Sequence, residues 1–187
     1  GSRLILTNKN YDEVVERLKA KIAKMKIGDP MDKDTDIGPL VSDKQQKRVL
    51  EYIAIGKKEG ARLVYGGGVP KGFEGGCFVE PTLFADVNNE MRISQEEIFG
   101  PVLAVIKAKD ENDAIRIANA SHFGLAGGVW SRDNERAFSV AKKLRAGTVW
   151  INEWHLLNDK APFGGYKQSG IGRELGLEGL RAYTEAK

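Results

Sequence analysis

The spacing of apolar residues changes at position 11. A short apolar run at 4–6 precedes a polar turn at 8–10, which indicates a brief buried strand. From 11 to 25 the apolar positions recur every three or four residues, a pattern typical of one face of an amphipathic helix. Gly28 and Pro30 follow, and both residue types favour the end of a helix.

The next stretch predicts a second helix and two short strands. Ser42, with Gln45 three residues later, forms a capping-box pair that predicts a helix from there to about Gly60. Residues 63–65 are apolar and indicate a strand. Residues 78–84 are also extended in pattern, but Pro81 removes a backbone donor, so we expect this segment at the edge of a sheet.

From residue 102 onward, strands and helices alternate. The pattern predicts strands at 102–106, 127–130 and 148–151, with helices at 110–120 and 133–145 between them. Each strand is apolar throughout, which favours a mainly parallel sheet with helices on both faces, and hence the α/β class. A glycine-rich loop from 164 should lead into a short helix at 173–182.

Composition narrows the classes of function. With 187 residues, 41% hydrophobic and 29% charged, the chain is expected to be soluble and to bury one core. Its net charge of +3 is spread along the sequence, and no basic stripe points to nucleic acid. No apolar run approaches the roughly 20 residues of a membrane span. The single cysteine, Cys77, excludes an internal disulfide and fits a reducing compartment, so we expect a cytoplasmic protein.

General motifs leave the function open. The sequence contains no Walker loop, no G-x-G-x-x-G and no G-x-S-x-G elbow. Its two histidines, His122 and His155, lie far apart and away from the cysteine, which argues against a zinc site. We expect no metal site built from these residues.

Two segments carry features of a binding site. Glu97 and Phe99 stand two positions apart, on one side of an extended chain, just before a buried strand. A carboxylate can accept the hydroxyls of a ribose, and an aromatic ring can pack on a flat heterocycle. The alternative is a strand entry with Phe99 in the core and Glu97 in water. The second segment, 161–174, is dense in glycine, which permits close backbone approach, although a flexible connection would also explain it.

Both segments belong to a series of ordered blocks that resembles the aldehyde dehydrogenase superfamily. The blocks run from Gly1–Arg3 through Gly38–Pro39, Pro81–Thr82, Glu97–Pro101, Gly124–Ala126, Ala146–Asn152 and Pro162–Lys167 to Gly172–Glu174 and Ala182–Thr184. The resemblance implies that residues 1–187 form a single partial domain, the C-terminal part of the catalytic domain, beginning just after the catalytic cysteine. It implies a parent enzyme that oxidises an aldehyde to a carboxylic acid with NAD or NADP, through a thiohemiacetal and a thioester on that cysteine.

The resemblance assigns cofactor contacts to five residues. Glu97 matches the ligand of the nicotinamide ribose, and Phe99 matches the ring beside the nicotinamide. Gln45 and Arg48 match positions near the adenosine ribose, although Gln45 is equally well explained as the capping partner of Ser42. Leu125 matches a leucine that borders the nicotinamide, and core packing explains it just as well.

Other positions match the substrate tunnel and minor roles. Phe163, Leu157 and His155 match tunnel positions. Glu174 matches a proton relay, although it could simply favour a helix start. The backbone carbonyls of Lys167 and Gly170 match ligands of a monovalent cation. Cys77 falls where the family has an ordinary hydrophobic residue, so we expect a small apolar filler and not the nucleophile.

The family's nucleophile and general base lie upstream of the matched blocks, so we expect the chain alone to be inactive. The implied partners are a small-molecule aldehyde and further copies of the chain, because strand 148–152 is expected to leave a free edge. Two alternatives remain: a naturally short, non-catalytic module that acts by protein interaction, and an acylating enzyme that passes the acyl group to coenzyme A. The sequence does not specify the aldehyde.

Overall fold

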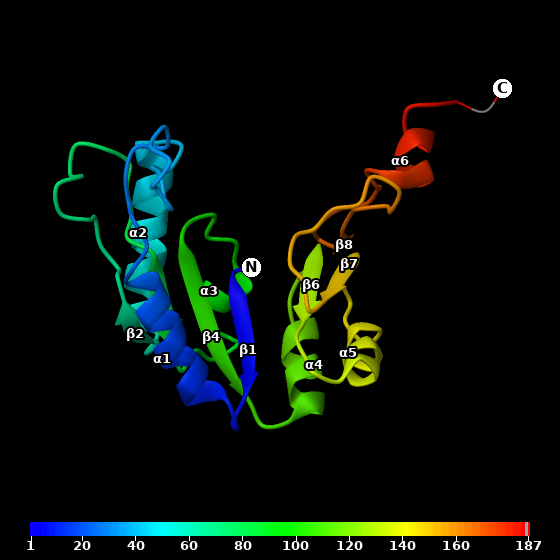
Figure 1. Ribbon diagram of the computed structural model, residues 1–187, viewed down its shortest axis with the longest axis horizontal. Helices are drawn as coiled ribbons and strands as arrows, with labels where there is room; N and C mark the ends of the chain where they lie inside the picture. Colours follow the sequence, from blue (N-terminus) through cyan, green and yellow to red (C-terminus); the bar gives the residue numbers. More distant parts are fainter. Residues whose placement is uncertain (186) are drawn as a thin grey trace. The chain divides into compact units, whose positions relative to one another are not determined.

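The computed structural model describes residues 1–185 and 187, and the chain separates into two compact units. The first comprises Gly1–Ala114 and the second Ile115–Lys187. Helix α4 (Glu111–Asn119) contains the boundary between them (Figure 1). A single partial domain over 1–187 stays a prediction.

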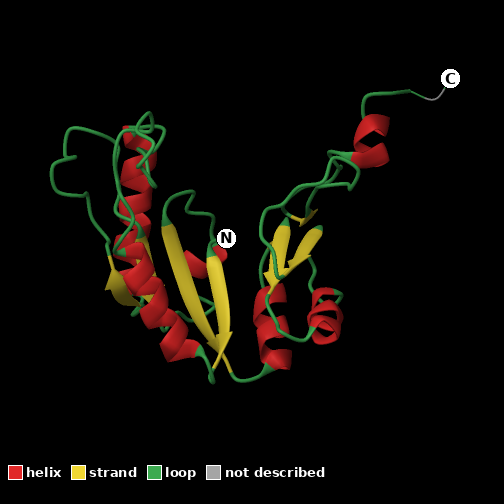
Figure 2. Cartoon of the chain, viewed as in Figure 1, coloured by secondary structure: helices red, strands yellow, loops and turns green. Residues whose placement is uncertain are grey.

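The first unit is built on a mainly parallel sheet. Its strands are β1 (Arg3–Thr7), β2 (Arg62–Tyr65), β3 (Thr82–Ala85) and β4 (Val102–Ala108), in the order β1-β4-β3-β2. Strand β4 runs parallel to both β1 and β3, and β2 is antiparallel to β3. The arrows of β1 and β4 lie side by side and point the same way in Figure 2. The long apolar run 102–106 therefore lies inside the sheet, as its uniform hydrophobicity predicts.

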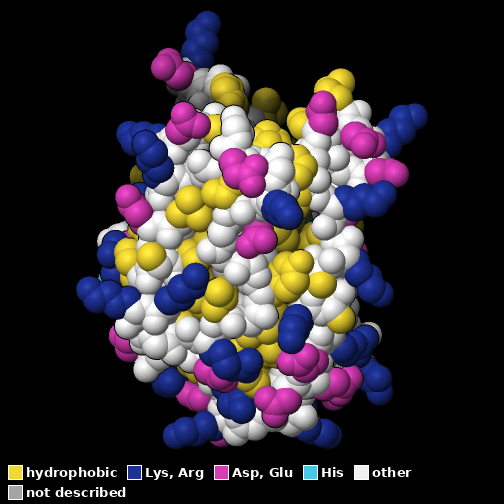
Figure 3. Space-filling model, turned by 90° about the vertical axis from the view of Figure 1, so that its left-hand side faces the viewer, with side chains coloured by type: hydrophobic (Ala, Val, Ile, Leu, Met, Phe, Trp, Pro, Cys, Tyr) yellow, Lys and Arg dark blue, Asp and Glu magenta, His cyan; other side chains and the backbone are white. Residues whose placement is uncertain are grey.

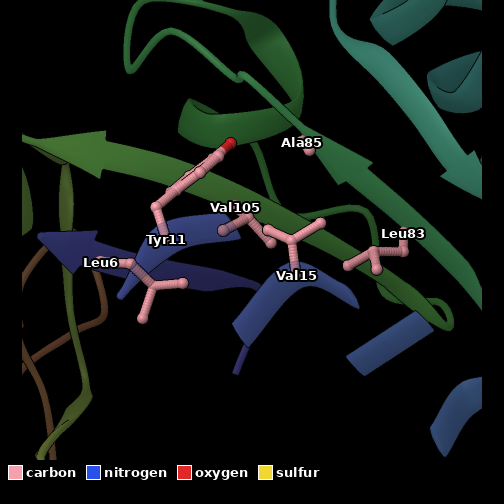
Figure 4. Packing of buried hydrophobic residues seen from close by; sticks show 6 residues of the cluster. All are labelled: Leu6, Tyr11, Val15, Leu83, Ala85 and Val105. Atoms are coloured by element: carbon pink, nitrogen blue, oxygen red, sulfur yellow. The ribbon is translucent and has the colours of Figure 1, made fainter. Parts of the chain in front are cut away.

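Helix α1 (Tyr11–Ile22) covers one face of this sheet. Its Tyr11 and Val15 are almost completely buried against Leu6, Leu83 and Val105, side chains from three different strands. Figure 4 shows this cluster gathered between the helix and the strands. Val105 of β4 belongs to this cluster and Leu103, two positions earlier, packs against it, which is the period of two expected of a strand.

Helices α2 (Asp43–Lys58) and α3 (Arg92–Gln95) pack on the opposite face. The close fit is visible at Gly56, where an added Cβ would lie 3.0 Å from Ile93 Cδ1 and 3.2 Å from Phe84 Cζ. Val49 and Ile53 of α2 are buried on the same side. The first unit thus has the α/β layers that the sequence pattern predicts.

The prediction that the segment containing Pro81 is an edge strand is wrong. Strand β3 begins after the proline, at Thr82, and lies between β2 and β4. The missing N–H of Pro81 therefore falls outside the hydrogen-bonded ladder and does no harm to an internal strand. The next residue, Thr82, is the one whose N–H donates, to the carbonyl of Pro101 at 2.7 Å.

Several helices are shorter than their hydrophobic periodicity indicates. Helix α1 ends at Ile22, and Met25, placed on its apolar stripe by the sequence, is 39% exposed. Helix α5 (Asn134–Ala141) ends before the predicted limit, and helix α6 (Gly176–Arg181) begins after it. Periodicity continues through terminal turns that are not α-helical, so it overestimates helix length.

The second unit contains two small sheets. Strand β6 (Ala126–Val129) runs parallel to β7 (Thr148–Ile151), and β5 (Phe123–Gly124) pairs antiparallel with β8 (Tyr166–Lys167). Within the described residues, β7 has a paired strand on one side only. A free edge of β7 in the whole protein, and its use by a second copy, stay predictions.

The surface mixes charges of both signs. Lys and Arg side chains alternate with Asp and Glu on the face shown in Figure 3, and apolar side chains lie between them. Among residues 1–185 and 187, no helix has the length and hydropathy needed to span a bilayer.

Candidate functional site

The segment Glu97–Phe99, between α3 and β4, turns two candidate side chains outward. Ile98 is buried, with 3% of its surface exposed, whereas Phe99 is 75% exposed and Glu97 is exposed. The middle residue therefore anchors the segment, and its neighbours face solvent on the other side. The alternative that places Phe99 in the core is wrong.

Phe99 adopts an unusual backbone conformation. Its φ is +58°, in the left-handed region that a bulky side chain rarely occupies. Such a conformation costs about 1–3 kcal/mol and persists only where neighbouring contacts impose it. The next residue shows how tightly the segment lies on α2, because a Cβ at Gly100 would be 2.5 Å from Val49 Cγ2.

Two side chains of α2 hold the backbone of this segment. Gln45 Nε2 donates to the carbonyls of Ile98 and Phe99, each at 3.0 Å. Arg48 Nη2 donates to the carbonyl of Glu97 at 2.9 Å. Three consecutive carbonyl groups are thus bound by one helix.

These contacts decide between the two interpretations of Gln45 only in part. Ser42 caps α2 as predicted, with its Oγ accepting from the Gln45 backbone N–H at 3.2 Å. The Gln45 amide nitrogen also donates to the carbonyls of Ile98 and Phe99. These bonds are separate from the return bond of a capping box, in which the amide oxygen would accept from the Ser42 N–H. A direct contact of Gln45 or Arg48 with an adenosine ribose stays a prediction.

Arg48 also belongs to a hydrogen-bond network that the sequence did not predict. Tyr52 Oη donates to Glu96 Oε2 at 2.6 Å and accepts from Arg48 Nη2 at 3.3 Å. Arg92 binds Glu96 through two hydrogen bonds, of 2.7 and 2.9 Å. Arg92, and then Tyr52, lower the pKa of the Glu96 carboxyl to about 2. The available signal was the i,i+4 spacing of 48 with 52 and of 92 with 96.

In the second unit, the backbone joins two predicted site residues. Phe163 and Glu174 form an antiparallel bridge, with reciprocal N–H to carbonyl bonds of 2.7 Å. Phe163 is half-buried and Glu174 is exposed. The bridge joins the two ends of the glycine-rich segment through two backbone hydrogen bonds.

The other tunnel candidates lie on an exposed stretch after β7. His155 is exposed, has a φ of +64°, and its ring centroid lies 6.2 Å from that of Trp150. Leu157 is 47% exposed, and Leu125, between β5 and β6, is 43% exposed. Burial therefore gives no support to core packing as the explanation of Leu125.

The proposed cation ligands lie in a turn beside a shallow pocket. The Lys167 carbonyl accepts from the Gly170 N–H at 3.4 Å, and Lys167 Nζ donates to the carbonyls of Asn119 and Ser121. The pocket is lined by Arg145, 165–167 and 170–173. In the described part of the chain, no three His, Cys, Asp or Glu side chains are grouped to hold a metal.

Cys77 differs from the expected apolar filler. It is half-buried, and its Sγ donates to Asp43 Oδ1 at 2.9 Å. That hydrogen bond raises the pKa of the thiol. Because a thiolate is the reactive form, this environment disfavours a nucleophilic role, in agreement with the sequence analysis.

Comparison with proteins of known sequence places the whole chain in one group. The model of the aldehyde dehydrogenase family matches residues 1–187. A betaine aldehyde dehydrogenase of Brucella melitensis is 49% identical over 189 residues, which cover 100% of this chain and 39% of the relative. The chain thus spans well under half the length of the curated relatives it matches.

Solved structures agree with this result. A betaine aldehyde dehydrogenase of Staphylococcus aureus in complex with NAD+ superposes with a TM-score of 0.97 at 44% identity, over 100% of this chain and 38% of that one. An aldehyde dehydrogenase of Mycobacterium tuberculosis complexed with NAD+ gives a TM-score of 0.95 at 49% identity, over 98% and 38% of the two chains. The α/β fold is therefore shared in detail with these enzymes, and the chain belongs to the aldehyde dehydrogenase family.

Proposed function

We propose that the protein containing this chain oxidises an aldehyde to a carboxylic acid with NAD, and that this chain supplies one wall of the active site. The observation that carries the proposal is the outward presentation of Glu97 and Phe99 from a segment held at three successive carbonyls. Family membership and the NAD+ complexes of two relatives support the choice of cofactor.

The two side chains suit the nicotinamide half of NAD. The Glu97 carboxylate has the acceptor capacity to bind both hydroxyls of a ribose, and the exposed Phe99 ring offers an apolar face to a flat heterocycle. When bound, the nicotinamide accepts the hydride removed from the substrate. Glu97 and Phe99 would fix the ring's position, which is how a protein contributes to a cofactor reaction. NADP in place of NAD is the alternative for this site.

The second unit carries the residues that we propose for contact with the aldehyde. Phe163 would line the tunnel with its half-buried ring, with His155 and Leu157 near the mouth. Glu174, bridged to Phe163, is the candidate relay, and the carbonyls of Lys167 and Gly170 are the candidate cation ligands. The family's nucleophilic cysteine and general base match no position here, so this chain by itself is proposed to be inactive. A cytoplasmic location and a homo-oligomer are part of the same proposal.

The test is Glu97→Gln in the complete protein that contains this chain. The change removes a charged acceptor of ribose hydroxyls. A hydrogen bond to a charged group is worth about 1.5–3 kcal/mol, so NAD affinity should fall by about tenfold or more. Thermal unfolding without NAD should stay the same because Glu97 is exposed. Isothermal titration with NAD measures the affinity, and the exposed Glu51→Gln of α2 is the control. An unchanged NAD affinity in Glu97→Gln removes this residue from the site.

A further inference from the structure

We propose that Arg48, Tyr52 and Glu96 act as positioning residues that hold the Glu97–Phe99 segment in its binding shape. Together with Gln45 and Arg92 they form what we call the clamp. The link from the clamp to the cofactor rests on the function proposed above. The clamp itself rests only on contacts within the first unit.

The clamp acts on backbone and leaves the side chains free. Gln45 and Arg48 lie three residues apart on α2, so they project to the same side of the helix. Their hydrogen bonds end on the carbonyls of residues 97, 98 and 99. The carboxylate of Glu97 and the ring of Phe99 take no part in these bonds, and both residues are exposed. The arrangement therefore fixes the segment without occupying the groups that would meet a ligand.

Tyr52 contacts Arg48 through both its ring and its hydroxyl group. The Arg48 guanidinium carbon lies 5.0 Å from the centre of the Tyr52 ring, and Arg92 lies 5.5 Å from the same ring. Both distances allow cation–π attraction. The Tyr52 hydroxyl, in turn, accepts from Arg48 and donates to Glu96. One phenol thus connects the two arginines with the carboxylate that pairs with Arg92.

The hydrogen bonds of the clamp reach both the Glu97–Phe99 segment and the residue before it. Glu96 directly precedes Glu97. Tyr52 and Arg92 bind the Glu96 side chain, and Arg48 binds the backbone carbonyl of Glu97. Both ends of the clamp therefore act within four consecutive residues. A closed set of restraints explains how Phe99 keeps a left-handed backbone that it would leave if free.

The clamp leads to an expectation that a direct cofactor contact would not. Tyr52 is buried, with 6% of its surface exposed, and its hydroxyl is bound to protein groups. Removal of that hydroxyl should loosen the segment and weaken NAD binding through Glu97 and Phe99. If the cofactor were bound without help from the segment's shape, the same change would leave NAD affinity as it is.

The experiment uses Tyr52→Phe in the complete protein, with two measurements. Thermolysin cleavage at the Ile98–Phe99 bond, followed by mass spectrometry without NAD, reports local opening, because the buried Ile98 must leave the core first. Isothermal titration reports NAD affinity. Tyr65→Phe is the matched control, since Tyr65 packs on the α1 side of the sheet. We expect cleavage and the NAD dissociation constant each to rise by about tenfold or more in Tyr52→Phe, the effect of losing one hydrogen bond to a charged group, and neither to change in Tyr65→Phe.

Glu96→Gln is the second variant, and it keeps an acceptor for Tyr52 but loses the charge that binds Arg92. It should give a smaller rise in both measurements, with exposed Glu51→Gln as its control. Unchanged cleavage in both variants overturns the clamp, whatever NAD does. Faster cleavage with unchanged NAD affinity overturns the positioning role, and Glu97→Gln then decides separately whether the proposed function stands.

Discussion

At the scale of single residues, the most restrictive position is the glycine beside the candidate site. Gly100 allows the chain after Phe99 to touch Val49, a completely buried residue of α2. No side chain fits there without moving either the helix or the segment. The sequence shows a glycine at this position but does not show what it faces, because the partner lies 51 residues away.

Gly100→Ala should therefore destabilise the protein. The new methyl group would overlap Val49 Cγ2, and overpacking of a filled core costs typically 1–3 kcal/mol. Urea unfolding of the variant measures this loss. Gly75→Ala is the control, because an added Cβ there meets nothing within 4 Å, and its free energy of unfolding should change by about 0.5 kcal/mol at most. Equal stability of both variants would show that α2 or the segment yields easily.

Cys77 offers a second test at the residue scale. The Asp43 carboxylate accepts the thiol's hydrogen bond and raises the pKa of Cys77, so the thiol is less reactive than an ordinary cysteine. Asp43→Ala should lower that pKa and speed the reaction with a disulfide reagent at pH 8 several-fold. Asp12→Ala, in the first turn of α1, removes the same charge from another helix and should leave the rate as it is. A slower reaction in Asp43→Ala would contradict this account.

At the scale of elements, the sequence predicts what depends on local periodicity and misses what depends on remote partners. The runs at 102–106 and 148–151 and the cap at Ser42 were found because apolar spacing and capping chemistry are local. The place of β3 inside the sheet was missed because it depends on β2, which pairs with it from another part of the chain. The short helix α3 was missed because four residues are too few to show a period.

The same distinction applies to the candidate site. Resemblance to a family drew attention to Glu97, Phe99, Gln45 and Arg48, and these four lie together in the first unit. It did not reveal that the Gln45 and Arg48 side chains bind the backbone of the segment. Nor did it reveal Tyr52 and Glu96, because a hydrogen bond across 44 residues leaves no local pattern.

The contact between α2 and α3 should respond to acid. The folded-state pKa of Glu96, about 2, is lower than the ordinary value of 4.5, chiefly because Arg92 binds the carboxylate. Ionised Glu96 therefore stabilises the fold fully above pH 4.5, and the contribution is lost as the pH falls from there to about 2. Wild type should exceed Glu96→Gln in free energy of unfolding by a constant amount above pH 5.5, and the difference should shrink below pH 4.5.

Urea unfolding of both proteins between pH 7 and pH 2.5 measures this difference. Glu51→Gln, on the exposed side of α2, should show no such narrowing. A difference between wild type and Glu96→Gln that stays constant down to pH 3 would show that Arg92 and Tyr52 do not lower the pKa of Glu96 in solution.

At the scale of the whole molecule, the buried core is unevenly divided. Among the described residues, the buried apolar side chains of the second unit are Ile117, Ala137 and Trp150, and all the others belong to the first unit. The second unit also carries most of the large apolar side chains that are exposed, among them Ile171 and Tyr183. Hydrophobic burial is the main stabilising contribution to folding, so the two units should differ in local stability.

Amide hydrogen exchange of the 187-residue chain should therefore divide near residue 115. Slow amides should concentrate in β1, β3, β4 and α2, whose side chains fill the core, and the slowest should exchange only on global unfolding. Amides of β6, β7 and α6 should exchange faster, through local opening that exposes little additional apolar surface. Mass spectrometry of peptides from the exchanged chain resolves this difference. Equal protection on both sides of residue 115 would mean that the second unit gains stability from something other than its own core, because the buried side chains named above are too few to provide it.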